Sequence, residues 1–263
     1  MTDEAVEYPP TIDRAWLDRE AARDPIAHAY AVWDLAHHPG RIRVVSAVVA
    51  GRTLGYLLVW FGHPTAPVVH WVGTEPRLAA LADRLPERPL VAIVPEPFRG
   101  AGREHRGPVV EVPLLSLLAG EPPERPAPGP AVRRLAGGDR TALAAWAAAQ
   151  DDPVVAEYAY LDPDAELLWG AFDAERLVGV VRAAVRLPAI WILGGVYVEP
   201  THRGRGLGRS LVATALAAAR EEGAALALYV REDRPPARAL YAALGFRTVG
   251  RRYWLDAGSG LAP

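Results

Sequence analysis

The chain has 263 residues, about half of them hydrophobic, a formal net charge of −2 and no cysteine. Its length suits two domains. The charge argues against a nucleic-acid partner, because there is no basic excess, and the lack of cysteine excludes disulfides, thiolate zinc sites and thiol catalysis. The acidic start MTDEAVEYPP and the absence of a bilayer-spanning run lead us to expect a cytoplasmic protein without membrane contact. Arginine replaces lysine entirely, which indicates a bacterial source.

The first 118 residues alternate between helical and strand-like patterns. Apolar spacing predicts helices over 11–24, 26–36 and 76–85, and strands over 42–50, 54–61, 68–72, 90–94 and 109–112. We expect this half to be one domain of the order ααβββαβ.

Two features of this half resemble functional motifs. A short glycine-containing stretch, FRGAG at residues 98–102, is superficially similar to a cofactor-binding glycine loop. However, Glu104 occupies the final glycine position, and residues 104–108 cannot begin an apolar helix. His37 and His38 are adjacent at a helix end, so they cannot face one metal ion. We interpret both as ordinary surface features.

Residues 119–130 read AGEPPERPAPGP. Proline at this density favours an extended, semi-stiff spacer. We therefore predict an N-terminal domain over 1–118, a linker over 119–130 and a C-terminal domain over 131–263.

The C-terminal half starts again with a strand over 131–135 and a helix that Asp139 caps and that ends near Gln150. A polar and aromatic connection over 151–163 follows. Further strands are predicted over 166–172, 177–185, 189–198 and 224–230, with a closing pair over 246–249 and 253–255; helices are predicted after the next glycine loop to about 222 and from Pro235 to Gly245.

The stretch GGVYVEPTHRGRGLGRSL, residues 194–211, carries the strongest signal. A strand ends at Val198, Pro200 stops it, and Gly204, Gly206 and Gly208 lead into an alanine-rich helix. Such glycines let successive N–H groups point outward, and with the helix dipole they form a phosphate or pyrophosphate site. Three arginines add positive charge: Arg203, Arg205 and Arg209.

Spacing excludes two common nucleotide motifs. A Walker loop needs a lysine, and in a G-x-G-x-x-G reading the third glycine would fall on Arg209 or Leu211. The remaining pattern is R-x-x-G-x-G preceded by V-x-V-x-P. The alternative to a phosphate site is a glycine turn that only caps a core helix.

This pattern resembles the GNAT acyltransferases, and the two-half chain is similar to their glycine acyltransferase-like members. The resemblance implies an α/β (α+β) fold with a mixed, mostly antiparallel sheet flanked by helices, and an N-terminal degenerate GNAT-like domain without a cofactor loop. It implies acetyl-CoA, or another short acyl-CoA, as co-substrate and no metal. The implied cofactor-binding residues are Val196, Tyr197, Val198, Arg203, Gly204, Arg205, Gly206, Leu207, Gly208, Arg209, Ser210 and Arg234.

Gly194 and Gly195 lie inside the strand that precedes this loop. They are consistent with a bulge that begins the parting of two strands, where the family places the pantetheine arm, although a plain kink fits them too. The amides of Val196, Tyr197 and Val198 could then bond the pantetheine and polarise the thioester carbonyl.

The stretch 238–246, RALYAALGF, matches the family's second motif and implies Tyr241 as the proton donor to the departing thiolate. Without that match, Tyr241 would be a core tyrosine. Arg234 stands where many members have asparagine, and Ile192 and Tyr229 stand at two familiar positions of the base. Base candidates are Glu157, Asp151, Asp152 or an ordered water chain.

We therefore expect an N-acetyltransferase that passes a short acyl group directly to the amine of a small molecule. Two alternatives stay open: a catalytically silent acyl-CoA sensor, and an acetyltransferase of protein lysines or N-termini. The acceptor, the acyl length, the role of the N-terminal half and the oligomeric state, a homodimer included, are left open by the sequence.

Overall fold

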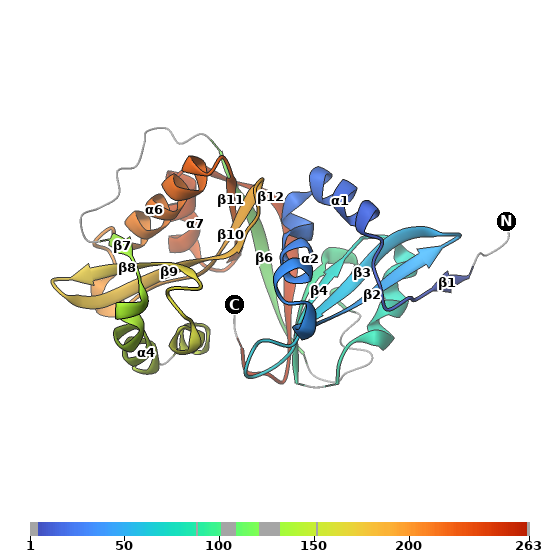
Figure 1. Ribbon diagram of the computed structural model, residues 1–263, viewed down its shortest axis with the longest axis horizontal. Helices are drawn as coiled ribbons and strands as arrows, with labels where there is room; N and C mark the ends of the chain where they lie inside the picture. Colours follow the sequence, from blue (N-terminus) through green and yellow to red (C-terminus); the bar gives the residue numbers. More distant parts are fainter. Residues whose placement is uncertain (1–4, 88, 101–108, 121–131, 151, 262–263) are drawn as a thin grey trace. The chain divides into compact units, whose positions relative to one another are not determined.

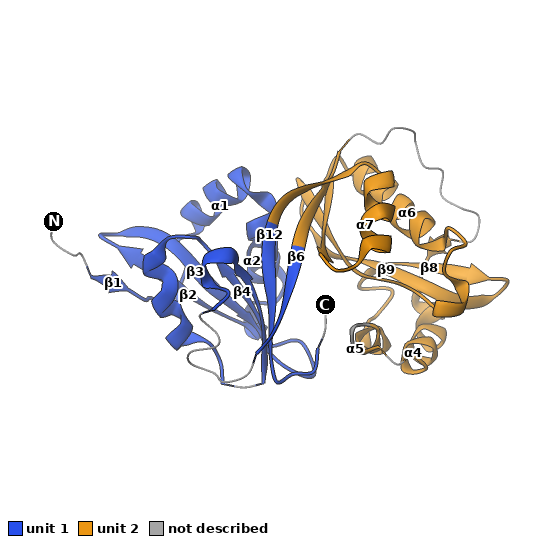
Figure 2. Cartoon of the chain, turned by 180° about the vertical axis from the view of Figure 1, so that it is seen from behind, with its two compact units in different colours: residues 1–114, 251–263 blue, residues 115–250 orange. Residues whose placement is uncertain are grey.

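A computed structural model describes residues 5–87, 89–100, 109–120, 132–150 and 152–261. The chain forms two compact units, drawn in different colours in Figure 2: unit 1 comprises residues 1–114 and 251–263, and unit 2 comprises residues 115–250. None of the described helices is long and apolar enough to cross a membrane.

Unit 1 is a sheet with helices α1 and α2 on one face (Figure 1). The strands follow the order β1-β2-β3-β4-β5-β12, with β4 and β5 parallel and the other pairs antiparallel. Its elements are β1 Val6–Glu7, α1 Arg14–Arg23, α2 Pro25–His37, η1 Pro39–Arg41, β2 Ile42–Val49, β3 Arg52–Trp60, β4 Val68–Val72, η2 Pro76–Arg84, β5 Leu90–Pro95 and η3 Glu96–Phe98, with parts of β6 Val110–Ala119 and β12 Phe246–Ala257.

The two helices of unit 1 begin where aspartates cap them. The Asp13 carboxylate accepts the N–H of Trp16 at 3.1 Å, and the Asp24 carboxylate accepts that of Ala27 at 3.0 Å. Pro25 follows at the first position of α2, where its missing N–H costs nothing.

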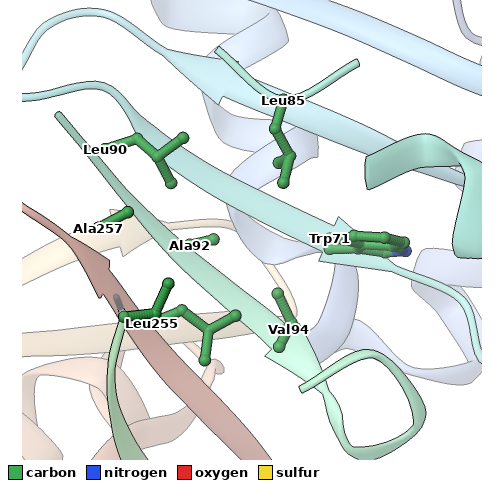
Figure 3. A pocket seen from close by; sticks show the side chains of 8 residues that line it. Trp71, Leu85, Leu90, Ala92, Val94, Leu255 and Ala257 are labelled. Atoms are coloured by element: carbon green, nitrogen blue, oxygen red, sulfur yellow. The ribbon is translucent and has the colours of Figure 1, made fainter. Parts of the chain in front are cut away.

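An apolar hollow lies on the opposite face of the unit 1 sheet (Figure 3). Its lining comes from β4, β5, β12 and the segments beside them, and consists of Trp71, Leu85, Leu90, Ala92, Val94, Val109, Leu255 and Ala257. The Trp71 ring stacks on Phe98 with ring centroids 4.7 Å apart. Among the described residues that line the hollow, no side chain titrates or acts as a nucleophile.

The strands of unit 2 are covered on both faces, with α6 and α7 packed on one side and α4 and η5 on the other (Figure 1). Strands β7 to β10 pair antiparallel in the order β7-β8-β9-β10, and β11 joins β10 in parallel. Its elements are β7 Val132–Arg134, η4 Gly137–Asp139, α4 Arg140–Ala148, α5 Pro153–Ala156, η5 Glu157–Tyr160, β8 Leu167–Asp173, β9 Arg176–Arg186, β10 Ile190–Val198, η6 Pro200–His202, α6 Leu207–Glu221, β11 Ala225–Arg231 and α7 Pro235–Ala243, with parts of β6 and β12.

The predicted fold class is confirmed, because the strands of both units pair in a mixed, mostly antiparallel pattern and are flanked by helices. The predicted closing pair of strands is wrong: 246–257 is one strand, β12, since Gly250 does not adopt the positive φ of a turn. The strand predicted over 109–112 continues through Pro113 to Ala119 as β6.

Asp139 is the N-cap residue of α4, but its carboxylate does not accept an N–H of that helix as the prediction required. Its carboxylate instead accepts two bonds from the Arg133 guanidinium, at 2.7 and 2.8 Å, and one from the N–H of Ala136 at 2.9 Å. Arg133 holds the pKa of Asp139 down to about 2.

The compact units divide the chain differently from the predicted halves. Residues 251–263 belong to unit 1, and residues 115–118 belong to unit 2. Residues 121–130 of the predicted linker lie outside the described residues, as do 101 and 102 of the FRGAG stretch.

Candidate functional site

The glycine loop between β10 and α6 has the backbone that the sequence pattern requires. Gly204 and Gly206 have φ values of +77° and +81°, and Gly206 is the N-cap residue of α6. No described side chain caps this helix. The N–H groups of its first turn, from Leu207, Gly208 and Arg209, therefore have no intrahelical acceptor, and they end a 15-residue helix whose dipole favours an anion.

The three arginines of the loop differ in what they contact. Arg203 donates from Nε to the carbonyl of Val198 at 2.9 Å, and its guanidinium lies 5.5 Å from the centre of the Tyr197 ring. Arg205 and Arg209 are exposed. Arg203 thus braces the loop against β10, while Arg205 and Arg209 supply positive charge beside the helix end.

Helix α7 packs against the first turn of α6. A Cβ added to Gly208 would lie 3.2 Å from Leu240 Cδ1, so the glycine permits this close approach. Leu207 and Leu240 contact the apolar core that contains Tyr241. The structure therefore brings the helix that carries Tyr241 next to the glycine loop. Within α6, the backbone carbonyl of Ser210 accepts a hydrogen bond from the Thr214 hydroxyl.

Tyr241 is 6% exposed, and burial raises its pKa to about 12. Its ring lies 5.7 Å from that of Phe246, centroid to centroid. Among the described residues, nothing accepts a hydrogen bond from its hydroxyl. At neutral pH this phenol carries a proton and can donate it to a new acceptor.

Strand β10 contains the predicted bulge, which is confirmed. Gly194 pairs with Arg182 and Tyr197 pairs with Val180, so β10 has one residue more than β9 over this stretch. Gly195 has a φ of +57°. Parallel pairing with β11 extends only from Ile190 to Leu193. The backbone of Val196, Tyr197 and Val198 lies beyond that last pair, where β10 and β11 part.

An ionic network around the buried carboxylate of Glu199 lies at the end of β10 and was missed from the sequence. Glu199, 8% exposed, accepts two bonds from Arg176 at 2.8 and 2.9 Å and one from Trp146 Nε1 at 3.0 Å. His202 Nδ1 lies 3.2 Å from the same carboxylate. Nothing local signals this network, because Trp146 and Arg176 are 53 and 23 residues away from Glu199.

The predicted base candidates are not free carboxylates at the loop. Glu157 forms an ion pair with Arg182 at 3.1 Å, and both side chains are less than 20% exposed. Asp152 is half-buried, and Asp151 lies outside the described residues. Ile192 is fully buried, so that position offers no base.

Two further predicted positions lie on the same unit. Tyr229 is half-buried in β11, and Arg234 is exposed at the N-cap of α7. Tyr158, which the sequence analysis did not single out, is fully buried and bonds the carbonyls of the bulge.

Residues 132–246 match the family model described as Acetyltransferase (GNAT) family. The chain is 40% identical over 91 residues to a mycothiol acetyltransferase of Corynebacterium glutamicum, covering 33% of this chain and 29% of that one. It is 54% identical over 52 residues to the mycothiol acetyltransferase of Tsukamurella paurometabola, covering 20% and 17%. It is 37% identical over 83 residues to the N-alpha-acetyltransferase RimI of Mycobacterium tuberculosis, covering 31% and 51%. The chain thus spans about half or less of the length of these curated relatives.

Solved structures with the same fold match more of the chain. A tandem GNAT protein from the clavulanic acid biosynthesis pathway aligns over 98% of this chain and 100% of its own, with a TM-score of 0.60 and 19% identity. A GNAT-family putative acetyltransferase of Novosphingobium aromaticivorans aligns over 77% and 88%, with a TM-score of 0.57 and 23% identity. At these identities the likeness shows the fold, and the tandem protein is consistent with two halves.

Proposed function

We propose that the chain is an N-acetyltransferase that transfers an acetyl or other short acyl group from acyl-CoA directly to the amine of a small molecule, because residues 132–246 match the model of the GNAT acetyltransferase family. The observation that carries the proposal is the glycine N-terminus of α6, which no described side chain caps and which Arg205 and Arg209 flank. A diphosphate is the ligand that fits such a group of outward N–H donors and positive charges.

Each element of the site has a role in this proposal. The loop from Arg203 to Ser210 holds the diphosphate of acyl-CoA. The pantetheine arm lies along the β10 backbone from Val196 to Val198, where β11 no longer pairs with β10. An N–H group there stabilises the oxyanion that forms when the carbonyl is attacked.

The transfer needs two proton movements. The amine nitrogen attacks the thioester carbon, a C–N bond forms, the C–S bond breaks, and Tyr241 gives its proton to the departing thiolate. Burial keeps this tyrosine protonated, because the pKa of its hydroxyl is about 12. The amine loses its own proton to water or to a carboxylate; we assign no residue, since Glu157 is held by Arg182 and Ile192 is apolar.

The names of the relatives support a small acceptor first. Two of them are mycothiol acetyltransferases, and we propose a small-molecule amine for this chain on that basis. The similarity to an N-alpha-acetyltransferase favours protein N-termini as a second candidate acceptor. The apolar Ile192 favours the third reading, an acyl-CoA sensor without turnover.

Turnover assays separate these functions. The full chain is incubated with acetyl-CoA or propionyl-CoA and a panel of small amines, and free thiol is measured. Transfer to a small amine supports the proposal, and tight coenzyme A binding without transfer to any amine favours the sensor. Mass spectrometry of a lysate treated with labelled acetyl-CoA tests protein acceptors, since label on N-termini or lysines would move the assignment to proteins.

A further inference from the structure

Tyr158 lies in η5 with no exposed surface, and its hydroxyl points at the backbone of the β10 bulge. The hydroxyl donates to the carbonyl of Gly195 at 2.7 Å and lies 3.2 Å from the carbonyl of Gly194. Burial raises the pKa of this tyrosine, so the hydroxyl keeps its proton and remains a donor.

The bulge and the tyrosine fit each other closely. A bulge takes backbone groups out of the strand ladder, and a buried carbonyl left without a donor is costly. Tyr158 supplies that donor. Gly195 must also be glycine, because its φ is +57° and an added Cβ would lie 2.4 Å from the Tyr158 hydroxyl oxygen.

The residue before Tyr158 holds the neighbouring strand. Glu157 forms the ion pair with Arg182 of β9, and Arg182 is the register partner of Gly194. A Cβ added to Gly194 would lie 3.3 Å from Arg182 Nε. Two successive residues of η5 therefore contact the bulge region: Tyr158 bonds the backbone of β10, and Glu157 pairs with Arg182 of β9.

We propose that Tyr158 is a positioning residue for acyl transfer: its hydroxyl fixes the Gly194–Gly195 bulge, so that the N–H groups of Val196, Tyr197 and Val198 meet the pantetheine arm and the thioester. This inference rests on the proposed function. The competing explanation is that Tyr158 only fills the apolar core among residues such as Leu143, Trp146 and Leu168.

The test compares Tyr158→Phe with Tyr160→Phe, a matched control in the same element whose side chain is 76% exposed. Two ligands are titrated by calorimetry: coenzyme A, and the adenosine bisphosphate half of coenzyme A, which lacks the pantetheine arm. In Tyr158→Phe we expect coenzyme A to bind about tenfold more weakly and kcat to fall about tenfold, the effect of one unsatisfied buried carbonyl. The nucleotide half should bind Tyr158→Phe as tightly as it binds the unaltered chain. Tyr160→Phe should bind both ligands with unchanged affinity.

The outcomes distinguish this inference from the proposed function. If both ligands weaken equally in Tyr158→Phe, or if neither weakens and kcat is unchanged, Tyr158 is a core residue and the inference is overturned alone. If the unaltered chain binds no coenzyme A, the proposed function fails and the inference fails with it.

A second measurement applies if Tyr158→Phe does not fold. The hydroxyl proton of Tyr158 is then followed by NMR in the unaltered chain. A shift of this resonance with coenzyme A, but not with the nucleotide half, supports the inference. An unchanged resonance with both ligands overturns it.

Discussion

Two buried tyrosines of unit 2 show how surroundings decide a side chain's chemistry. Burial raises the pKa of both Tyr158 and Tyr241, so both stay protonated. The Tyr158 hydroxyl already donates its hydrogen bond to the carbonyl of Gly195. The Tyr241 hydroxyl has no acceptor among the described residues, which leaves its proton available for a new acceptor.

Replacing Tyr241 by Phe should lower kcat about a hundredfold, the lower end of the usual range for general acid catalysis. The affinity for coenzyme A should change little, because the ring and its contact with Phe246 are retained. Steady-state kinetics and calorimetry on the same preparation check this. Since the pKa is about 12, the proposed activity of the unaltered chain should not fall through this group between neutral pH and pH 10. Equal turnover in the variant would remove the assigned role.

Asp34 of α2 should make unit 1 less stable as the pH rises. Burial raises the pKa of this carboxyl from 3.8 to about 7, so the folded state binds its proton more tightly than the unfolded chain does. The stabilising contribution of the protonated Asp34 carboxyl is fully present below about pH 4 and is lost as the pH rises through 7. Burial also lowers the pKa of His70, to about 3, which gives the opposite slope at acid pH; only the difference between variants is therefore informative.

The measurement for Asp34 is chemical unfolding of the unaltered chain and of Asp34→Asn between pH 4 and 8. The variant should be more stable than the unaltered chain at pH 8, by an amount on the order of a few kcal/mol, and this advantage should shrink toward pH 4. Asp18→Asn, an exposed position on α1, is the control. A pH-independent difference between Asp34→Asn and the unaltered chain would contradict the assignment.

At the scale of elements, patterns local in sequence were predicted and contacts between distant residues were not. The V-x-V-x-P and glycine pattern predicted the strand, the loop and the helix, because those residues determine their own backbone. The bulge was expected from Gly194 and Gly195. Tyr158 and the Glu199 network were missed, since their partners are separated by 23 to 53 residues and nothing local indicates them.

The glycine loop should respond to a change of one methyl group. Gly206 has a φ of +81°, and an added Cβ would meet no atom within 4 Å, so Gly206→Ala acts through the backbone alone. The left-handed conformation costs a non-glycine residue about 1–2 kcal/mol, so coenzyme A should bind roughly tenfold more weakly. Gly138→Ala in η4 is the control, because Gly138 also has open space and its φ is not positive. Equal affinities of the two variants, measured by calorimetry, would contradict the role of the loop.

At the scale of the whole molecule, the end of the chain completes the first unit. Residues 252–257 of β12 pair with β5, from Arg252 opposite Pro95 to Ala257 opposite Leu90. Tyr253, Leu255 and Ala257 belong to the apolar core of unit 1. We therefore expect that cutting the chain in the proline-rich stretch would leave the first unit incomplete.

A fragment of residues 1–118 should not fold alone, because it would leave the edge of β5 and that core exposed. Circular dichroism should show no cooperative thermal transition for this fragment, and adding a peptide of residues 251–263 should restore one. Cooperative unfolding of the fragment by itself would show that unit 1 does not need the end of the chain.

The most direct measurement is a calorimetric titration of the full chain with coenzyme A, paired with its melting temperature. We predict saturable heat at one site per chain and a rise in melting temperature that grows with ligand concentration, as expected for a ligand that binds only the folded state. If coenzyme A gives no heat and no shift in melting temperature, the glycine end of α6 binds no diphosphate ligand, and the account is contradicted.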